Sequence, residues 1–260
     1  MYRFYIDASQ KNGDVIEIVG EDVNHIKNVL RMKNGERFVL CDGAGNDYLC
    51  ELSEVREKTL MAVVLEEHES DTELPVRLVL FQGLPKKDKM ELIIQKAVEL
   101  GAAEIVPVVT KRTIVKTESG KDEKKLTRWQ AIAESAAKQS GRGVIPRVAP
   151  ICSWKEALAQ MDKLEYNTIL YENARGMQPT AEFVKTAAEK KSVGILVGPE
   201  GGFTEDEVVT AKEHGAQCLS MGKRILRTET AGLAMLSILM LTIECSEVDA
   251  ELKSDAEKCV

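Results

Sequence analysis

Apolar and polar residues alternate along the first seventy residues with the period of two that is typical of half-buried strands. Strands are predicted over residues 2–7, 15–19, 37–42, 48–55 and 59–66. One helix is predicted over residues 21–31, where Val23, Ile26, Val29 and Leu30 form a single apolar face. Several short strands in so few residues indicate a small β-barrel.

From residue 76 onward, continuous apolar runs alternate with helical patterns. The predicted strands cover residues 76–84, 104–109, 167–173, 192–198 and 217–222. The predicted helices cover residues 88–101, 124–139, 181–189 and 205–214, with a last one beginning near Thr228. Apolar strands that alternate with helices indicate a parallel sheet covered on both faces. The protein is therefore expected to be of the α/β class, with an all-β domain N-terminal to the α/β domain.

The last helix contains the longest apolar stretch, residues 231–243, interrupted by Gly232, Ser237 and Thr242. Thirteen residues are too few to span a bilayer, so we expect a helix that is buried nearly all round and no membrane association. The polar run at 66–75 indicates a linker. The expected organisation is a β domain over 1–72, an α/β domain over 73–246 and an acidic, flexible tail over 247–260.

The amino-acid composition indicates a globular protein. Hydrophobic residues make up 44% and charged residues 30%, which excludes a collagen, a wholly disordered chain and a coiled coil. The net charge of −7 is uneven, with −8 over residues 1–74, +5 over 75–243 and −4 over 244–260. Basic clusters near residues 86–89, 111–116 and 121–128 can attract a phosphate backbone, although composition alone favours a solvated lysine surface.

Motifs of other enzyme classes are missing from the sequence. The chain has no G-x-G-x-x-G, G-x-x-x-x-G-K-[ST], H-E-x-x-H or G-x-S-x-G, which disfavours a Rossmann enzyme, a P-loop NTPase and a zinc hydrolase. Six cysteines are scattered without a C-x-x-C, and the histidines stand apart at 25, 68 and 214. We therefore expect no metal and no disulfides, and a cytoplasmic protein.

Two loops carry candidate chemistry, and each follows a predicted strand and leads into a helix. The first, residues 198–203, reads Gly-Pro-Glu-Gly-Gly-Phe, and Thr204 with Glu207 forms a capping box for the next helix. The second, residues 219–231, carries Arg227 and Glu229 at a helix start. Ligands of open α/β sheets bind beyond the carboxyl ends of strands. Each loop alone is equally consistent with a plain turn, and Arg227 with Glu229 equally well forms an ion pair.

At these motifs the chain resembles the bacterial small-subunit ribosomal RNA uridine-N3 methyltransferases, the RsmE family of the SPOUT class. The resemblance rests on LVGPEGGFTEDEV and LSMGKRILRTETA. It extends to Arg3-Phe4-Tyr5, to His25 through Arg31, to KMELIIQKAVELGAAEIVPV, and to Arg128-Trp129 with Gln139-Ser140 and Arg142. Order and spacing match over nearly the whole chain up to about residue 246.

The resemblance implies a fold, a cofactor and partners. It implies a PUA-like β-barrel followed by a SPOUT α/β domain with a C-terminal trefoil knot, a feature that periodicity does not reveal. It also implies S-adenosylmethionine bound in the knot, a homodimer with helix 231–243 near the interface, and 16S rRNA of the small ribosomal subunit as substrate. The cofactor contacts are expected at Gly198, Pro199, Glu200, Gly201, Gly202, Leu219, Ser220, Met221, Gly222, Leu226, Thr228, Thr230 and Ala231.

Methylation of uracil N3 requires loss of a weakly acidic imide proton, and the charge then spreads onto two carbonyl oxygens. We expect Arg227 to stabilise that charge and Glu229 to orient Arg227 or to accept the proton through water, with Glu200 as a weaker candidate base. RNA contacts are expected at Arg3, His25, Arg31, Lys33, Lys86 and Arg142. Two alternatives stay open: ribose 2′-O methylation by another SPOUT enzyme, and a non-catalytic RNA-binding ribosome-assembly factor.

Overall fold

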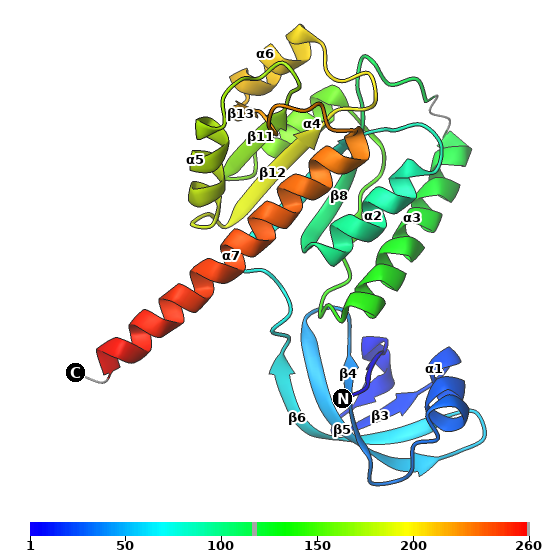
Figure 1. The fold of residues 1–260 in the computed structure, drawn as a ribbon. Helices are drawn as coiled ribbons and strands as arrows, with labels where there is room; N and C mark the ends of the chain where they lie inside the picture. The colour runs from blue at the N-terminus through cyan, green and yellow to red at the C-terminus, as the bar shows by residue number, and fades with distance from the viewer. Residues whose placement is uncertain (116–118, 259–260) are drawn as a thin grey trace. The chain divides into compact units, whose positions relative to one another are not determined.

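The computed structural model in Figure 1 describes residues 1–115 and 119–258, with the side chains of 1–115 and 120–246. The chain divides into two compact units. The first consists of Met1–Glu73 and the later segment Ala137–Ile145, and the second of Leu74–Ala136 and the chain from Pro146 onward. The return of residues 137–145 to the first unit is not foreseeable from local sequence pattern.

The first unit is built on one six-stranded sheet in the order β1-β4-β5-β6-β3-β2. Its strands are β1 (Arg3–Tyr5), β2 (Lys11–Asn12), β3 (Val15–Ile18), β4 (Arg37–Cys41), β5 (Asn46–Val55) and β6 (Leu60–Glu69), with a short 3₁₀ helix η1 (Ala8–Gln10). Only β1 and β4 pair in parallel. The five predicted strands are confirmed. Alternating residues such as Ile16, Ile18, Phe38 and Leu40 point into one shared core, which is why the period of two predicted them.

The helix predicted over 21–31 differs from the prediction. It forms one short α-helical turn, α1 (Glu21–Asn24), followed by a π-helical turn, η2 (His25–Val29). The wider turn carries Val29 to the surface, where it is 65% exposed, while Val23 and Ile26 stay buried. The predicted apolar face is therefore shorter than a regular helix would have made it.

The second unit contains an all-parallel sheet in the order β10-β8-β7-β12-β11-β13, with β9 beside β8. Its strands are β7 (Arg77–Gly83), β8 (Ala102–Val109), β9 (Arg147–Val148), β10 (Cys152–Ser153), β11 (Tyr166–Leu170), β12 (Ser192–Val197) and β13 (Ala216–Leu219). Its helices are α2 (Lys89–Glu99), α3 (Ser119–Ser140), α4 (Trp154–Met161), α5 (Gln178–Ala187), α6 (Glu205–Glu213) and α7 (Thr228–Lys258).

Helices cover both faces of this sheet, as the alternation of strands and helices predicted. Helices α2, α5 and α7 lie on one face (Figure 1). On the other face, α4 and α6 pack onto a core that includes Val79, Phe81 and Leu196. Helix α4 was not among the predicted elements, although Ser153 and Glu156 form a capping box at its start. Its eight residues are too few for a strong periodic signal.

Helix α7 differs from the sequence expectations in its burial, in the length of its apolar segment and in the backbone of residues 247–258. It is not buried nearly all round: Leu236 and Leu239 are fully buried, whereas Ile238 and Leu241 are 42% and 59% exposed. The segment Thr228–Ser246 is also long and apolar enough to cross a bilayer by length and composition, a property shared with core helices of soluble proteins; one third of it is buried. The backbone expected to form a flexible tail continues the helix to Lys258, because Ala, Glu and Lys favour helix.

Candidate functional site

The carboxyl ends of neighbouring strands β7, β12, β11 and β13 meet at one edge of the parallel sheet. The loops that leave β11, β12 and β13 enclose a cavity of about 400 Å³, a size within the range of small-molecule sites. It is lined by Lys89, by residues 170–172, 197–203 and 220–222, and by residues 224–228 with Ala231. Both loops singled out in the sequence therefore contribute to a single cavity.

The glycine-rich loop after β12 is held by contacts that need small residues. Gly202 has a φ of +67°, which favours glycine. A Cβ on Gly83 at the end of β7 would lie 2.6 Å from the Pro199 side chain and 2.7 Å from the Pro199 backbone nitrogen. Arg112 donates a hydrogen bond of 2.8 Å to the Gly201 carbonyl. The loop is thus shaped by β7 and by the loop after β8.

The predicted capping box that follows this loop is confirmed. The Thr204 hydroxyl accepts a hydrogen bond from the Glu207 amide, and the Glu207 carboxylate accepts one from the Thr204 amide. Phe203 and Val208 are both buried in the core under α6. The start of α6, and with it the end of the glycine-rich loop, is therefore fixed by local sequence.

A buried hydrogen-bonded chain joins the two loops. The Thr228 hydroxyl, at the start of α7, donates to the Gly198 carbonyl at 2.5 Å and accepts from the Gln82 side-chain amide at 2.9 Å. The amides of Thr230 and Ala231 donate to the Arg227 carbonyl, so they are not free for a ligand. The Thr228–Gly198 hydrogen bond thus joins the two loops directly, and Gln82 on β7 holds the Thr228 hydroxyl that makes it.

Charged side chains gather at the mouth of the cavity. The Lys89 ammonium lies 3.0 Å from Glu200 Oε1 and 3.1 Å from Glu229 Oε2. The Glu200 carboxylate also accepts hydrogen bonds from the Lys86 amide at 3.1 and 3.2 Å. The side chain of Arg227 forms no hydrogen bond or ion pair with the residues that the structure describes. The ion pair of Arg227 with Glu229 that the sequence left open is therefore not formed.

These contacts set the protonation of the two carboxyl groups. For both, burial alone would raise the pKa, but hydrogen bonds from their own backbone amides and from Lys89 outweigh it, so the pKa of Glu200 and the pKa of Glu229 are lowered. The Lys89 ammonium donates to the carboxylates of Glu200 and Glu229, and these contacts raise the pKa of Lys89. A carboxylate with a lowered pKa is a weaker base, which argues against Glu200 and Glu229 as the proton acceptor.

Most of the residues expected to contact the cofactor line the cavity, but two of them do not. Leu219 is buried beneath it at 1% exposure, and Thr230 is exposed to solvent. Glu229 does not line the cavity either, but it pairs with Lys89, which does. The wall further includes residues that sequence reasoning missed: Lys89, Leu170, Tyr171, Glu172, Val197, Phe203, Arg224 and Ile225. Residues 170–172 end β11, so the strand-end rule used for the two loops could have found them.

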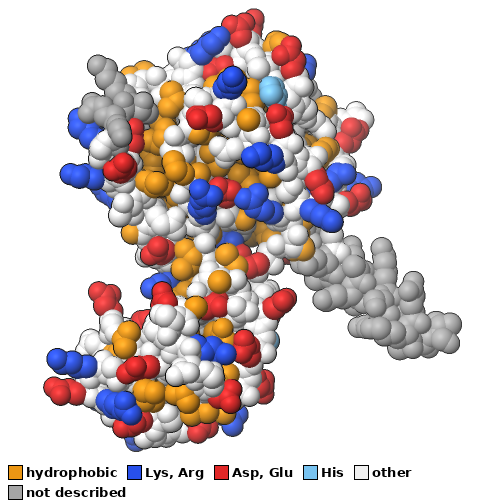
Figure 2. Space-filling model, turned by 180° about the vertical axis from the view of Figure 1, so that it is seen from behind, with side chains coloured by type: hydrophobic (Ala, Val, Ile, Leu, Met, Phe, Trp, Pro, Cys, Tyr) orange, Lys and Arg blue, Asp and Glu red, His pale blue; other side chains and the backbone are white. Residues whose placement is uncertain are grey.

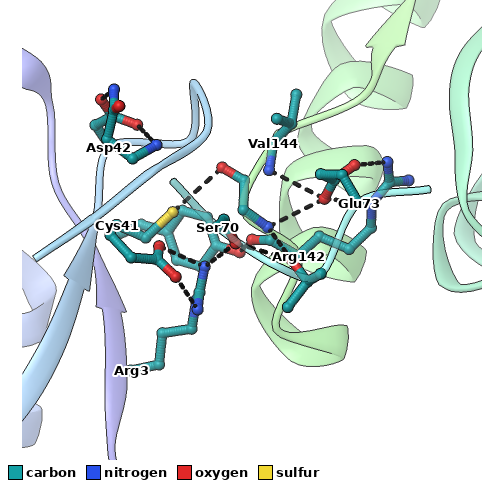
Figure 3. Close-up of polar contacts among 12 residues, drawn as sticks. Arg3, Cys41, Asp42, Ser70, Glu73, Arg142 and Val144 are labelled. Atoms are coloured by element: carbon teal, nitrogen blue, oxygen red, sulfur yellow. Dashed lines mark hydrogen bonds and ion pairs between the residues drawn. The ribbon is translucent and has the colours of Figure 1, made fainter. Parts of the chain in front are cut away.

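The arginines expected to contact RNA from the first unit are paired internally (Figure 3). Arg3 donates two hydrogen bonds of 2.7 Å to the carboxylate of Asp47, and a third to Ser70. Arg142 is 5% exposed and pairs with Glu73. The Glu73 carboxylate also accepts hydrogen bonds from the amides of residues 143 and 144. Both arginines therefore hold the first unit together, and their guanidinium groups are not free for phosphate.

The other expected RNA contacts lie at the surface: His25, Arg31, Lys33 and Lys86 are exposed. The His25 ring also packs edge-on against Phe4. On the face seen in Figure 2, basic side chains are interspersed with acidic ones over both units. That face carries no broad basic surface of the kind that binds nucleic acid by charge alone. Within the described part of the chain, no three His, Cys, Asp or Glu side chains cluster in a way that suits a metal ion.

Comparisons with known proteins connect these two units to RNA modification. Residues 72–240 match the RNA methyltransferase domain family, and residues 18–65 match the RNA methyltransferase PUA domain. The ribosomal RNA small subunit methyltransferase E of Bacillus subtilis is 36% identical over 94% of this chain and 98% of its own length. That of Mesomycoplasma hyopneumoniae is 35% identical over 91% of this chain and 98% of its own length.

Solved structures agree with the sequence matches. The ribosomal RNA small subunit methyltransferase E of Neisseria gonorrhoeae, bound to S-adenosylmethionine, is 36% identical, with a TM-score of 0.77 over 93% of this chain and 97% of that one. A Legionella pneumophila protein in complex with the same cofactor is 30% identical, with a TM-score of 0.76 over 92% of this chain and 96% of that one. This chain belongs to the ribosomal RNA small subunit methyltransferase E family.

Proposed function

We propose that this protein transfers a methyl group from S-adenosylmethionine to N3 of a uridine in the 16S rRNA of the small ribosomal subunit. The observation that carries the proposal is the cavity that the two motif loops form together at the carboxyl ends of β11, β12 and β13. The kinship with S-adenosylmethionine-bound relatives supports the choice of cofactor. The choice of N3 follows from the motif resemblance and from the guanidinium of Arg227, which has no partner among the described residues.

The residues present fit this cofactor. The cavity offers about 400 Å³, and a Cβ built on Gly222 would meet no atom within 4 Å, so open space lies against that backbone. Gly222 has a φ of +109°, a conformation that favours glycine. Backbone and aliphatic groups of residues 197–202, 220–222 and 224–226 would hold the nucleoside. When bound, S-adenosylmethionine supplies an electrophilic methyl group on a sulfonium centre.

The chain's own residues have three tasks in this reaction. The loops joined by Gln82 and Thr228 fix the cavity walls, which holds donor and acceptor in line. Arg227 places an unpaired cation where charge develops on the uracil oxygens as the N3 proton leaves. Because Glu200 and Glu229 are poor bases, we propose that this proton passes to water and that both carboxylates serve to anchor Lys89. The target base has to leave its stack to reach the cavity.

Three further features belong to the same proposal. The first unit closes as a PUA-like barrel that binds RNA through Arg31, Lys33 and neighbouring His25, and Lys86 on the second unit also contacts RNA.

The chain before α7 threads through the glycine-rich loop as a trefoil knot, in keeping with the hydrogen bond of Thr228 to Gly198. The exposed apolar residues of α7, among them Ile238 and Leu241, are covered by a second copy in a homodimer. With a ribosomal substrate, we propose a cytoplasmic enzyme.

The test is to incubate the purified protein with small ribosomal subunits that lack base methylation and with labelled S-adenosylmethionine. Nuclease digestion and mass spectrometry of the nucleosides then identify the product. We expect 3-methyluridine. A ribose 2′-O-methylated nucleoside would instead assign another SPOUT reaction. Binding of subunits without cofactor binding or methyl transfer would assign a non-catalytic assembly factor.

A further inference from the structure

Lys89 lines the cavity and opens the matched stretch KMELIIQKAVELGAAEIVPV, yet the sequence assigned it no role at the site. It is the first residue of α2, and its ammonium pairs with Glu200 of the glycine-rich loop and with Glu229 of α7. It therefore links three chain segments that are far apart in sequence. The three side chains are 19–28% exposed, so the ion pairs are partly shielded from water.

The pairing of Glu229 matters for Arg227, which stands two residues before it. The positive charge of Arg227 contributes to the lowered pKa of Glu229, but the cation within ion-pair distance of Glu229 is Lys89. If Lys89 lost its charge, the guanidinium of Arg227 would be the remaining partner for Glu229 at the start of α7. An arginine paired in this way no longer offers an unpaired charge to a substrate.

The geometry points to Lys89 as a positioning residue for methyl transfer: by holding Glu229, it keeps the Arg227 guanidinium unpaired and available to the substrate. This inference rests on the proposed function of Arg227. It assigns Lys89 no contact with the reacting atoms. The contacts that Lys89 donates to the carboxylates of Glu200 and Glu229 raise its pKa from a value already well above neutral pH, so Lys89 is charged at neutral pH.

The test compares Lys89→Met with the double variant Lys89→Met/Glu229→Gln in methylation of small ribosomal subunits. We expect Lys89→Met to lower kcat by about tenfold, a part of what loss of a charge-stabilising donor costs. The KM for S-adenosylmethionine should change less than kcat. Lys89→Arg should restore most of the rate, because it keeps the cation. The double variant should be several-fold faster than Lys89→Met, because the uncharged amide at position 229 no longer attracts Arg227.

The matched control is Lys96→Met, which removes a lysine on the same helix that pairs with Glu99 away from the cavity. It should leave kcat unchanged. Lys89→Gln serves as a second charge-removing variant if Lys89→Met folds poorly. A double variant no faster than Lys89→Met, or a Lys89→Met enzyme with the parent kcat, would overturn the inference, since a merely structural role predicts no rescue by removal of the Glu229 charge.

A second readout does not depend on activity. A crystal structure of Lys89→Met should show the Glu229 carboxylate within ion-pair distance of the Arg227 guanidinium, whereas an unpaired Arg227 would overturn the inference. If the parent protein binds S-adenosylmethionine but does not methylate the subunits, the proposed function fails. The pairing of Arg227 in the variant crystal would still report on the role of Lys89.

Discussion

The arginines of the first unit and the arginine at the cavity of the second differ in one respect, which is whether they have an internal partner. Arg3 and Arg142 are each held by a carboxylate, Asp47 and Glu73. Arg227 has no such partner among the described residues, and the carboxylate two residues after it, Glu229, is paired with Lys89. All three stand in stretches that match the family motifs. A motif arginine is thus structural or functional according to what its neighbours leave unpaired.

The largest expected effect concerns the unpaired arginine. Arg227→Ala should lower the methylation rate by about 10²–10³-fold, the usual cost of removing one charge-stabilising donor at a reacting centre. Binding of S-adenosylmethionine, measured by isothermal titration calorimetry, should stay within about threefold, because the cavity walls remain. A variant with full activity would remove Arg227 from the mechanism and end the contrast with Arg3 and Arg142.

The paired arginines should behave in the opposite way. Arg142→Met should lower the free energy of unfolding of the first unit by about 3 kcal/mol, because it leaves the Glu73 carboxylate without its cation in a largely buried setting. Cofactor binding should not change. Denaturant unfolding with calorimetric titration measures both quantities. The control is Arg56→Met, which breaks the exposed pair with Glu54 and should have no measurable effect on stability.

Two glycines sharpen the same contrast. Gly83→Ala should weaken S-adenosylmethionine binding by at least about tenfold, because the added Cβ would displace the backbone at Pro199 and move the glycine-rich loop. Gly143→Ala should instead destabilise the first unit, where the Cβ would lie 2.2 Å from the Ser70 side chain, and leave cofactor affinity as it is. Equal loss of affinity in both variants would contradict this division.

The smallest expected effects concern two residues with left-handed backbone, one in each unit. Arg31 has a φ of +55° and Lys87 a φ of +58°. At a positive φ the Cβ of a side chain is sterically strained, and glycine has no Cβ. Arg31→Gly and Lys87→Gly should therefore each raise the free energy of unfolding by up to about 1 kcal/mol. Thermal unfolding measures the change. A loss of stability in either variant would show that the side chain contributes more than the backbone conformation costs.

The sequence predicted correctly where the two site loops lie, but not which charged residues pair at the site. The loops at 198–203 and 219–231 do enclose one cavity, because strand ends and capping residues are local signals. The assignment of Glu200 and Glu229 as possible bases did not anticipate Lys89, which lies more than one hundred residues earlier in the chain. Nothing in the spacing of residues 89, 200 and 229 indicates that they meet.

The sequence by itself determined the strands of three residues or more in both sheets, the capping box at Thr204 and the class of the second unit, since each depends on residues within a few positions of one another. It did not predict the two-residue strands β2, β9 and β10. Only the tertiary structure decided which charges are paired, that residues 137–145 pack with the first unit, and that α7 keeps an exposed apolar side. Ion pairs and packing faces depend on contacts between segments distant in sequence, which local periodicity does not encode.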